Sequence, residues 1–266
     1  MTSSMIRKLN GLLKTESIGK VIHYQDEIGS TNAELIELGE KGASEGTVVI
    51  ADKQIEGKGR LERTWISPPG ANLYISILLR PKISAADSPL FTLLASIAVK
   101  ETIEKTGVKN TKIKWPNDIQ VEGKKLAGVL TEMRLKREMV DFIVVGIGVN
   151  INMSRDTINK EMGEVAKIAT SIKENLGKDI DRAKFTADLL LELEKGYQIF
   201  SNKGKAPILK EWTRAWGDLN KRVRISIEGE GEFEGNALGI DDSGYLLVKR
   251  DNGEISKIIA GDVTVV

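Results

Sequence analysis

A glycine-rich, basic stretch lies between two segments that each predict a β-strand, and it constrains the fold more than any other part of the chain. It reads Gly57-Lys58-Gly59-Arg60-Leu61-Glu62-Arg63-Thr64-Trp65. Residues 47–52 before it are rich in β-branched side chains, and residues 72–79 after it alternate apolar positions. We therefore expect a loop held at both ends by sheet, with the second strand returning beside the first.

The composition of this stretch suits an anionic ligand. Gly57 and Gly59 allow backbone amides to approach a ligand closely. Trp65 adds a flat face that stacks on an aromatic ligand or covers the apolar edge of the loop. Three cations lie in the same stretch: Lys58, Arg60 and Arg63. Mobile, solvated surface loops share this composition, so the rest of the chain decides between the two interpretations.

The composition is that of a globular protein with a sizeable core, at 266 residues, 41% hydrophobic and 29% charged. The absence of cysteine excludes disulfides, thiolate metal sites and a cysteine nucleophile. The single histidine, His23, excludes histidine-cluster metal sites, and we expect it to be a strand residue without a catalytic role. The net charge of +1 gives no global field for nucleic acid, so any basic patch is local.

The location of the protein follows from what the sequence lacks. No apolar run approaches the roughly 20 residues of a membrane span. The start, MTSSMIRKLN, has neither the apolar core nor the cleavage pattern of a signal peptide. Only residues 1–20 precede the first predicted strand, too few for a winged DNA-binding domain. We expect a cytoplasmic protein that contacts neither membrane nor DNA.

The remaining elements are predicted from periodicity and turn residues. Ser30 or Thr31 is expected to cap a helix over residues 33–38, with Glu34 completing a capping box. Other helices are predicted over residues 6–13, 89–105, 163–175, 182–200 and 206–215. Strands are predicted over 21–24, 112–121 with a Pro116-Asn117-Asp118 turn, 123–133 and 139–145, and a small β-barrel from about residue 220.

Polar clusters at the ends of these elements form the candidate site. They are Ser30-Thr31-Asn32, Gln54 with the basic stretch, Trp115-Pro116-Asn117-Asp118 with Lys125, and Gly146 to Asn150. Singly, each is an ordinary surface feature. Together they suit activation of a carboxylate by ATP, because attack of one anion on another requires cations that screen both. Neither a Walker phosphate loop nor a Rossmann fingerprint is present.

The sequence resembles the biotin protein ligases across roughly residues 21–152. The resemblance is carried by Ser30-Thr31-Asn32, Gln54, Gly57-Lys58-Gly59-Arg60, Arg63 with Trp65, Ser67-Pro68, Gly70-Ala71-Asn72-Leu73-Tyr74, Lys114-Trp115-Pro116-Asn117-Asp118, Lys125-Leu126-Ala127-Gly128 and Gly146-Ile147-Gly148-Val149-Asn150. It implies an α+β fold of the class II aminoacyl-tRNA synthetase and biotin ligase type, a mixed, mostly antiparallel sheet with packed helices. It also implies an N-terminal extension (1–20), a catalytic domain (21–218) and an SH3-like C-terminal domain (219–266).

The family implies a two-step reaction. Biotin and MgATP give biotinyl-5′-AMP and pyrophosphate, and a lysine on the biotin carboxyl carrier protein of a biotin-dependent carboxylase then takes the biotinyl group. The cofactors implied are ATP and Mg²⁺, with biotin as substrate. The family often forms homodimers by pairing sheets.

The resemblance also implies roles for individual residues. Those for biotin are Ser30, Thr31, Asn32, Gln54, Gly57, Lys58 and Gly128. Those for ATP and the adenylate are Gly59, Arg60, Arg63, Trp65, Asn117, Lys125 and Asn150. Those implied for catalysis are Lys125, Arg60, Arg63 and Asp118. Asp118 orients Lys125, assists Mg²⁺ or takes the proton of the incoming amine, and the sequence does not choose among these.

Two residues depart from the commoner family loop. Lys58 stands where arginine is usual, and lysine cannot make a planar two-pronged contact, so we expect it to supply charge and backbone only. Glu62 stands where glycine is usual, and it weakens the positive field and can pair with Arg60 or Arg63. We expect the loop to order over its ligand.

Three other interpretations are kept open. A lipoate or octanoate ligase shares the fold, whereas the transferase branch would need a cysteine. A biotin-sensing repressor would need DNA-binding capacity. A carrier-binding module without catalysis would form no adenylate.

Overall fold

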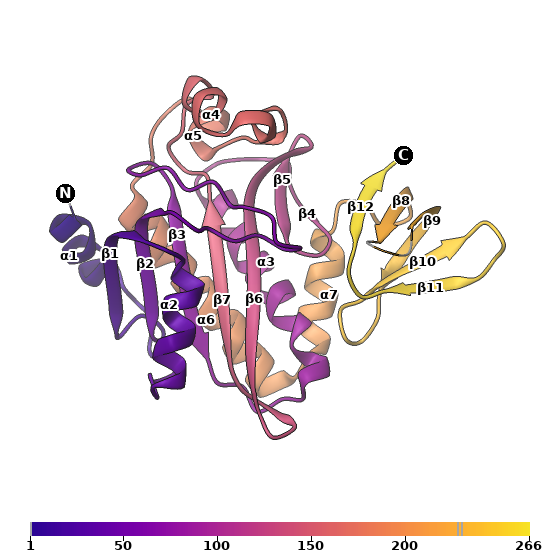
Figure 1. The fold of residues 1–266 in the computed structure, drawn as a ribbon, viewed down its shortest axis with the longest axis horizontal. Helices are drawn as coiled ribbons and strands as arrows, with labels where there is room; N and C mark the ends of the chain where they lie inside the picture. The colour runs from indigo at the N-terminus through magenta and orange to yellow at the C-terminus, as the bar shows by residue number, and fades with distance from the viewer. Residues whose placement is uncertain (1, 228, 230) are drawn as a thin grey trace.

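Seven strands form one mixed sheet at the centre of the computed structural model (Figure 1). Their order is β1-β2-β3-β7-β6-β5-β4. β1 and β2 are parallel, and every other neighbouring pair is antiparallel. The strands are β1 (Ile22–Ile28), β2 (Val48–Gln54), β3 (Leu73–Leu79), β4 (Thr111–Lys114), β5 (Asp118–Val121), β6 (Lys124–Lys136) and β7 (Met139–Val149). The predicted α+β class is confirmed.

The structure describes residues 2–227, 229 and 231–266. Met1, Glu228 and Glu230, which fall in the predicted N-terminal extension and C-terminal domain, lie outside the described residues. In the described part of the chain, no helix is both long and apolar enough to cross a bilayer.

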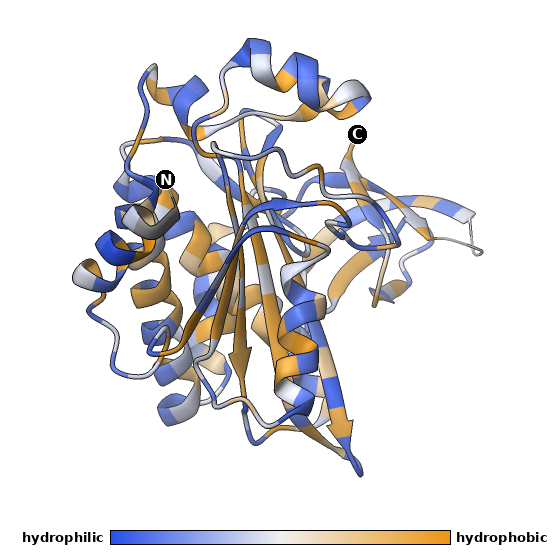
Figure 2. Cartoon of the chain, turned by 60° about the vertical axis from the view of Figure 1, so that its left-hand side comes forward, coloured by the Kyte–Doolittle hydropathy of each residue, from blue (hydrophilic) through white to orange (hydrophobic). Residues whose placement is uncertain are grey.

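Helices cover both faces of the large sheet. α2 (Thr31–Glu40) packs on one face, where its Leu35 and Ile36 meet Val49, Leu78 and Phe142. The larger core lies on the other face, and Figure 2 shows apolar segments of the helices turned toward the sheet. The helices there are α1 (Thr2–Leu12), α3 (Pro89–Lys105), α6 (Arg182–Lys203) and α7 (Ala206–Ala215).

The alternation along β3 explains how one strand serves both faces. Leu73, Ile75 and Ile77 belong to the larger core, as the pattern predicts. Ser76 and Leu78 point to the opposite face, under α2. The polar Ser76 therefore lies beside the start of α2, where the candidate site begins.

A second, smaller sheet forms from the C-terminal strands. It is antiparallel, in the order β11-β10-β9-β8-β12, and it lies to the right of the large sheet in Figure 1. The strands are β8 (Arg222–Ile227), β9 (Gly231–Ile240), β10 (Leu246–Arg250), β11 (Ile255–Ile258) and β12 (Asp262–Val265). The predicted closed barrel is not confirmed, because among the described residues β11 and β12 remain the two edges and do not pair.

Two predictions of local structure are wrong. Ser30 is the N-cap of α2 but makes no side-chain capping hydrogen bond, and Thr31 Oγ1 donates to Gln54 instead, so no capping box forms. The predicted helix over residues 163–175 is two short pieces, the 3-10 helix η2 (Gly163–Ile168) and α5 (Ile172–Leu176). Ser171 caps α5 by accepting from Glu174 N at 3.0 Å, which starts a new helix there.

Two further short helices were not predicted. They are α4 (Arg155–Glu161) and the single 3-10 turn η1 (Ala85–Asp87). Seven mostly polar residues with one buried apolar position, Ile158, give α4 no apolar periodicity to detect.

Candidate active site

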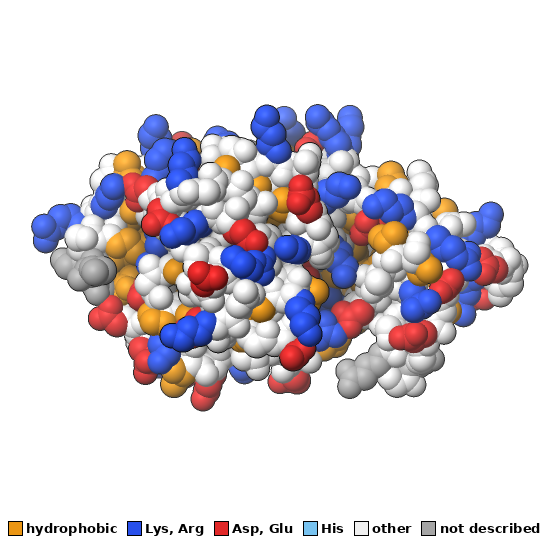
Figure 3. Space-filling view, turned by 90° about the horizontal axis from the view of Figure 1, so that it is seen from above, with side chains coloured by type: hydrophobic (Ala, Val, Ile, Leu, Met, Phe, Trp, Pro, Cys, Tyr) orange, Lys and Arg blue, Asp and Glu red, His pale blue; other side chains and the backbone are white. Residues whose placement is uncertain are grey.

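A cavity of about 660 Å³ lies beside the basic stretch, a size typical of small-molecule sites. Seen from above, the surface is hollowed between the large sheet and the C-terminal sheet, with Lys and Arg side chains at the hollow (Figure 3). Every predicted site residue except Gly57 lines this cavity: Ser30, Thr31, Asn32, Gln54, Lys58, Gly59, Arg60, Arg63, Trp65, Asn117, Asp118, Lys125, Gly128 and Asn150.

The basic stretch folds as a hairpin. Trp65 N donates to Gly57 O at 2.8 Å, and Gly59 N donates to Arg63 O at 2.6 Å. At its tip, Leu61 and Glu62 both have positive φ, at 52° and 56°. Two successive left-handed residues form the turn that closes tight hairpins, and glycine adopts that conformation without cost. Glu62, one of the two departures from the family loop, therefore occupies a backbone position that favours glycine.

Gly57 has a structural reason to be glycine, although it does not line the cavity. A Cβ at this position would lie 2.3 Å from Trp65 O and 2.8 Å from Ser67 Oγ. The base of the hairpin can close only because that atom is missing. Gly57 thus sets where Trp65 enters the cavity.

Trp65 lies flat on a platform of two glycines. Gly128 of β6 pairs directly with Gly148 of β7. A Cβ on Gly148 would lie 2.4 Å from Trp65 Cε2, and a Cβ on Gly128 would lie 3.2 Å from both Trp65 Cζ3 and Lys125 Cε. The glycines predicted to allow a close approach therefore admit the indole and the lysine chain against the backbone.

The buried end of the cavity is a cluster of hydrogen-bonding groups on α2 and β2. Gln54 Oε1 accepts from Thr31 N at 2.9 Å and from Thr31 Oγ1 at 3.0 Å. Gln54 Nε2 donates to Ser67 Oγ at 3.2 Å, and Ser67 Oγ donates to Trp65 O at 2.9 Å. Ser30 and Asn32 are buried beside them. The residues at this end can bind a polar group of a ligand through hydrogen bonds.

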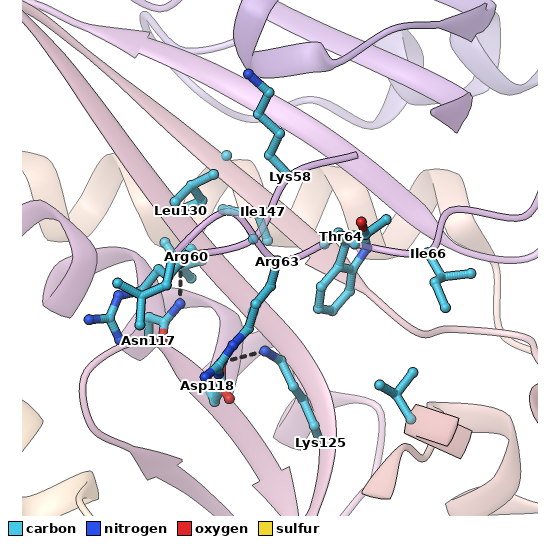
Figure 4. A pocket seen from close by; sticks show the side chains of 18 of the residues that line it. Lys58, Arg60, Arg63, Thr64, Ile66, Asn117, Asp118, Lys125, Leu130 and Ile147 are labelled. Atoms are coloured by element: carbon cyan, nitrogen blue, oxygen red, sulfur yellow. Dashed lines mark hydrogen bonds and ion pairs between the residues drawn. The ribbon is translucent and has the colours of Figure 1, made fainter. Parts of the chain in front are cut away.

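Lys125 lines the cavity and pairs with Asp118. Its Nζ is 2.7 Å from Asp118 Oδ1 and 5.2 Å from the centre of the Trp65 ring. Figure 4 shows Asp118 and Lys125 facing each other across the ion pair. Asn117 Nδ2 donates to Val129 O at 2.7 Å, which pins the turn bearing Asp118 onto β6. The ammonium is therefore held in place by the sheet and a carboxylate.

Arg60 and Arg63 form the cationic end. Arg60 lies over the Trp115 ring at 5.9 Å, and burial lowers its pKa, against the opposing effect of Asp118 and Asp262. Arg63 makes a two-pronged ion pair with Asp262 of β12, with Nη1 3.0 Å from Oδ1. These hydrogen bonds hold the pKa of the Asp262 carboxyl below its usual range.

Three buried polar atoms of cavity residues lack a hydrogen-bond partner in the described structure, and two of them, Asn150 Oδ1 and Trp65 Nε1, have no ion pair either. Asn150 Nδ2 donates to Thr170 O at 3.0 Å, so the NH₂ group of the amide is used and its oxygen remains without a partner. An unsatisfied buried acceptor costs free energy unless a ligand or water donates to it. Asn150 is thus suited to a donor such as an exocyclic amine.

Lys58 differs from the other cations of the hairpin. It is exposed, and in Figure 4 its side chain extends away from the Asp118 and Lys125 pair. Its side chain adds positive charge at the exposed edge of the cavity, and its limited role stays a prediction.

The cavity also includes two segments that were not predicted. Met162, Val165, Ile168 and Ala169 come from η2 and its ends, and Gly261, Asp262 and Val263 come from the start of β12. No signal in the sequence pairs Asp262 with Arg63, because 199 residues separate them. Among the described residues, no three His, Cys, Asp or Glu side chains group as a metal site.

The fold and the cavity first define a class: an α+β protein whose ligand-sized cavity joins a buried hydrogen-bonding end to a cation-lined end. The family model described as "Biotin/lipoate A/B protein ligase family" matches residues 24–150. The model described as "Biotin protein ligase C terminal domain" matches residues 218–266.

Individual proteins with similar sequence or structure support the same family. The bifunctional ligase/repressor BirA of Bacillus spizizenii is 42% identical over 94% of this chain and 76% of its own length. The biotin--[acetyl-CoA-carboxylase] ligase of Paracoccus denitrificans is 32% identical over 84% of this chain and 92% of its own. A biotin protein ligase from Aquifex aeolicus, solved with biotin and ATP, gives a TM-score of 0.76 at 30% identity, covering 93% of this chain and 99% of that one. The chain belongs to the biotin protein ligase family.

Proposed function

We propose that this chain activates biotin with ATP to biotinyl-5′-AMP and transfers the biotinyl group to a lysine of a biotin carboxyl carrier protein. The observation that carries this proposal is the position of Lys125. It lines the same cavity as the Thr31 and Gln54 hydrogen-bonding cluster and the Arg60 and Arg63 cations, and it pairs there with Asp118. With the biotin carboxylate activated at Lys125, the ureido ring of biotin would be held by the hydrogen-bonding cluster and the phosphates of ATP by the two arginines.

The buried end suits the ureido ring of biotin. That ring presents a carbonyl acceptor and two N–H donors, and the hydroxyl and amide groups of Ser30, Thr31, Asn32 and Gln54 offer both kinds of partner. Gly128 leaves room beside the strand, and the backbone near Gly57 and Lys58 closes the site from the hairpin.

The other end suits the adenylate. Arg60 and Arg63 would hold phosphate, with the backbone at Gly59 beside them. Trp65 would pack against the adenine side, and Asn150 Oδ1 would accept from the adenine amine. Asn117 contributes by holding the turn that carries Asp118.

In the first step, a biotin carboxylate oxygen attacks the α-phosphorus of ATP. The bond from that phosphorus to the bridging oxygen breaks, and pyrophosphate leaves with the electron pair. Lys125 lies where it can screen both anions and stabilise the charge that develops on phosphorus. Asp118 keeps the Lys125 ammonium in the cavity until substrate arrives.

Mg²⁺ would arrive with ATP and neutralise phosphate charge. It usually keeps several waters and binds through one or two carboxylates together with phosphates. Asp118, on the turn before β5, is a carboxylate that lines the cavity and could be one such ligand. Among the described residues, no group of three or more His, Cys, Asp or Glu side chains could hold a metal ion by itself.

In the second step, the carrier lysine amine attacks the biotinyl carbonyl, and AMP leaves with the electron pair of the broken acyl–oxygen bond. An amine with a pKa of about 10.4 is protonated at neutral pH and must lose a proton to react. Asp118 is the carboxylate next to Lys125 that can accept it.

The wider organisation belongs to the same proposal. We propose an N-terminal extension (1–20), a catalytic domain (21–218) and an SH3-like C-terminal domain (219–266). The order of the five C-terminal strands is compatible with a curved, SH3-like sheet. The edge strands β1 and β4 leave two edges for a homodimer formed by sheet pairing. We place the protein in the cytoplasm with its carrier.

The experiment that tests this proposal is ATP–pyrophosphate exchange. Exchange that depends on biotin and does not respond to lipoate supports the proposal. Exchange driven by lipoate or octanoate instead would favour the ligase alternative of the same fold, and no exchange with any of them would contradict both.

A further inference from the structure

A buried chain of side chains runs behind the hydrogen-bonding end of the cavity and ends on a carboxylate. Asn32 Nδ2 donates to Glu132 Oε2 at 2.7 Å and to Leu130 O at 3.2 Å. On its other side, Asn32 Oδ1 accepts from Ser76 Oγ at 2.6 Å. Ser76 Oγ also lies 2.8 Å from Thr31 Oγ1. Glu132 and Ser76 do not line the cavity, whereas Asn32 and Thr31 do.

Glu132 fixes which way the Asn32 amide points. An ionised carboxylate only accepts hydrogen bonds, so the NH₂ group of Asn32 must face Glu132 and its oxygen must face Ser76. Asn32 is 4% exposed and has no room to swing aside. A Cβ on Gly146 would lie 2.2 Å from Asn32 Oδ1, which shows how closely β7 presses on the amide.

The direction of Asn32 decides where the Ser76 proton goes. Ser76 is fully buried and has one hydroxyl proton, which two oxygens can reach. Thr31 Oγ1 gives its own proton to Gln54 Oε1, so it and Asn32 Oδ1 both accept from Ser76 and share that proton. If the amide were reversed, its NH₂ group would face Ser76, and the Ser76 proton would turn to Thr31 Oγ1.

We propose that Glu132 is a positioning residue for biotin recognition. Acting through Asn32 and Ser76, it holds Thr31 Oγ1 so that the lone pair not used by Ser76 faces the cavity. That lone pair then accepts from a ureido N–H of biotin, while the Thr31 hydroxyl donates to Gln54 Oε1. The inference rests on the proposed function and adds two residues, Glu132 and Ser76, that orient the ligand-reading groups without touching ligand.

The first part of the test is the kinetics of biotin-dependent ATP–pyrophosphate exchange. Glu132→Met keeps the length of the side chain but removes its strong acceptor, so KM for biotin is expected to rise about tenfold. KM for ATP and kcat should stay within about twofold of the unmodified protein, because the far end of the cavity is untouched. Glu132→Gln keeps an oxygen for Asn32 Nδ2 and should restore KM for biotin to within about threefold.

The second part distinguishes positioning from a general structural role. In a Thr31→Val or Ser76→Ala background the connection from Glu132 to the ligand is already cut. Adding Glu132→Met should then change KM for biotin less than about twofold, a non-additive result. Glu138→Met, on an exposed turn of β6 and β7, is the matched control and should leave all three parameters unchanged.

Each contrary result has a distinct meaning. A tenfold rise in KM for biotin in all backgrounds, or a parallel rise in KM for ATP, would overturn the positioning role and leave the proposed function standing. An unmodified protein without biotin-dependent exchange would overturn both. Should Glu132→Met fail to fold, Glu132→Ala in the same backgrounds gives the same comparison.

Discussion

At the scale of single residues, the proposed chemistry depends on the Lys125 ammonium, whose position is fixed by an ion pair with Asp118. Lys125 is bound by Asp118 at 2.7 Å and lies 5.2 Å from the centre of the Trp65 ring, and in the proposed reaction its charge would lie between the biotin carboxylate and the α-phosphate. A charge fixed before reaction costs no reorganisation during it. The sequence showed a lysine entering a strand, and only its partners distinguish it from neighbouring Lys124.

Lys125→Ala is predicted to reduce the rate of biotinyl-adenylate formation by about a hundredfold to a thousandfold, since a preorganised charge of this kind is removed. The melting temperature should change little, because the side chain is about one-third exposed. Pyrophosphate exchange measures the rate, and Lys124→Ala, the exposed neighbour, is the control. Near-normal exchange by Lys125→Ala would contradict its proposed role.

Gly148→Ala is predicted to displace Trp65. The added Cβ would lie 2.4 Å from Trp65 Cε2, so the indole must leave its platform. We expect at least a tenfold loss of exchange activity and a protein that still folds, since Trp65 lies at the cavity and not in the core. Gly11→Ala in α1 meets no atom within 4 Å and should keep full activity. An active Gly148→Ala protein would show that the platform is dispensable.

At the scale of elements, the hairpin over residues 57–65 gives a physical meaning to Glu62. Two adjacent left-handed residues without glycine make this turn less stable than the same turn with glycine at one of them, because each costs roughly 1–2 kcal/mol. The same strain favours a loop that opens and closes. Our expectation that it orders over ligand stays a prediction.

Glu62→Gly should therefore stabilise the hairpin by about 1 kcal/mol. The amides of Gly59 and Trp65 bond across it, so their hydrogen exchange should slow about fivefold in the ligand-free protein. Glu56→Gly changes a residue with ordinary φ and should not slow exchange. Unaltered or faster exchange in Glu62→Gly would argue against turn strain.

A buried carboxylate, that of Glu194, anchors the segment before β1 to the core. Glu194 of α6 accepts from Glu16 N and Ser17 N at 2.7 Å and from Ile18 N at 2.9 Å. Burial alone would raise the pKa of Glu194, but these amides together hold it below its usual range. The segment before β1 is thus fixed to the core by an ionised group.

Glu194→Gln is predicted to lower the free energy of unfolding by about 1.5–3 kcal/mol at pH 7. Because the folded-state pKa is depressed, this stabilisation is fully present above the ordinary glutamate pKa of about 4.3 and is lost as pH falls through the folded value. Urea denaturation from pH 7 to 3 should show the difference between the two proteins shrinking toward low pH. A difference that grows on acidification would reverse the sign, and exposed Glu138→Gln is the control.

Helices and strands with a clear apolar periodicity were predictable from the sequence. Features that depend on contacts with residues elsewhere in the fold were not. The helices at Pro89–Lys105 and Ala206–Ala215 match their predicted ranges, and the strand at Leu73–Leu79 starts one residue later than its predicted range of 72–79, because their apolar periodicity is local. The capping box failed because Thr31 Oγ1 found Gln54 across the sheet. The division of residues 163–175 depended on a serine cap within an apparently continuous helical pattern.

At the scale of the whole molecule, the two sheets meet at the cavity. Arg63 of the hairpin pairs with Asp262 of β12, and Trp115 Nε1 donates to Gly244 O of the β9–β10 turn at 3.2 Å. The C-terminal sheet therefore contacts both the hairpin and the turn that carries Asp118. Its contribution to the cavity is three residues at the start of β12.

Most of the predicted site residues line the cavity, whereas the segments from η2 and β12 and the connections between residues were not predicted. Motif spacing located the lining residues of the large sheet. The contacts of Arg63 with Asp262, and of Asn32 with Glu132 across 100 residues, depend on how two distant segments align in space. A single sequence carries no local pattern for such pairs, so they required the structure.

The most direct test of the central claim is mass spectrometry of a biotin carboxyl carrier domain incubated with this protein, biotin and MgATP. The account predicts a gain of one biotinyl group on one lysine, absent without ATP and strongly reduced with Lys125→Ala. A carrier whose mass stays unchanged, while a known ligase modifies the same preparation, would contradict it.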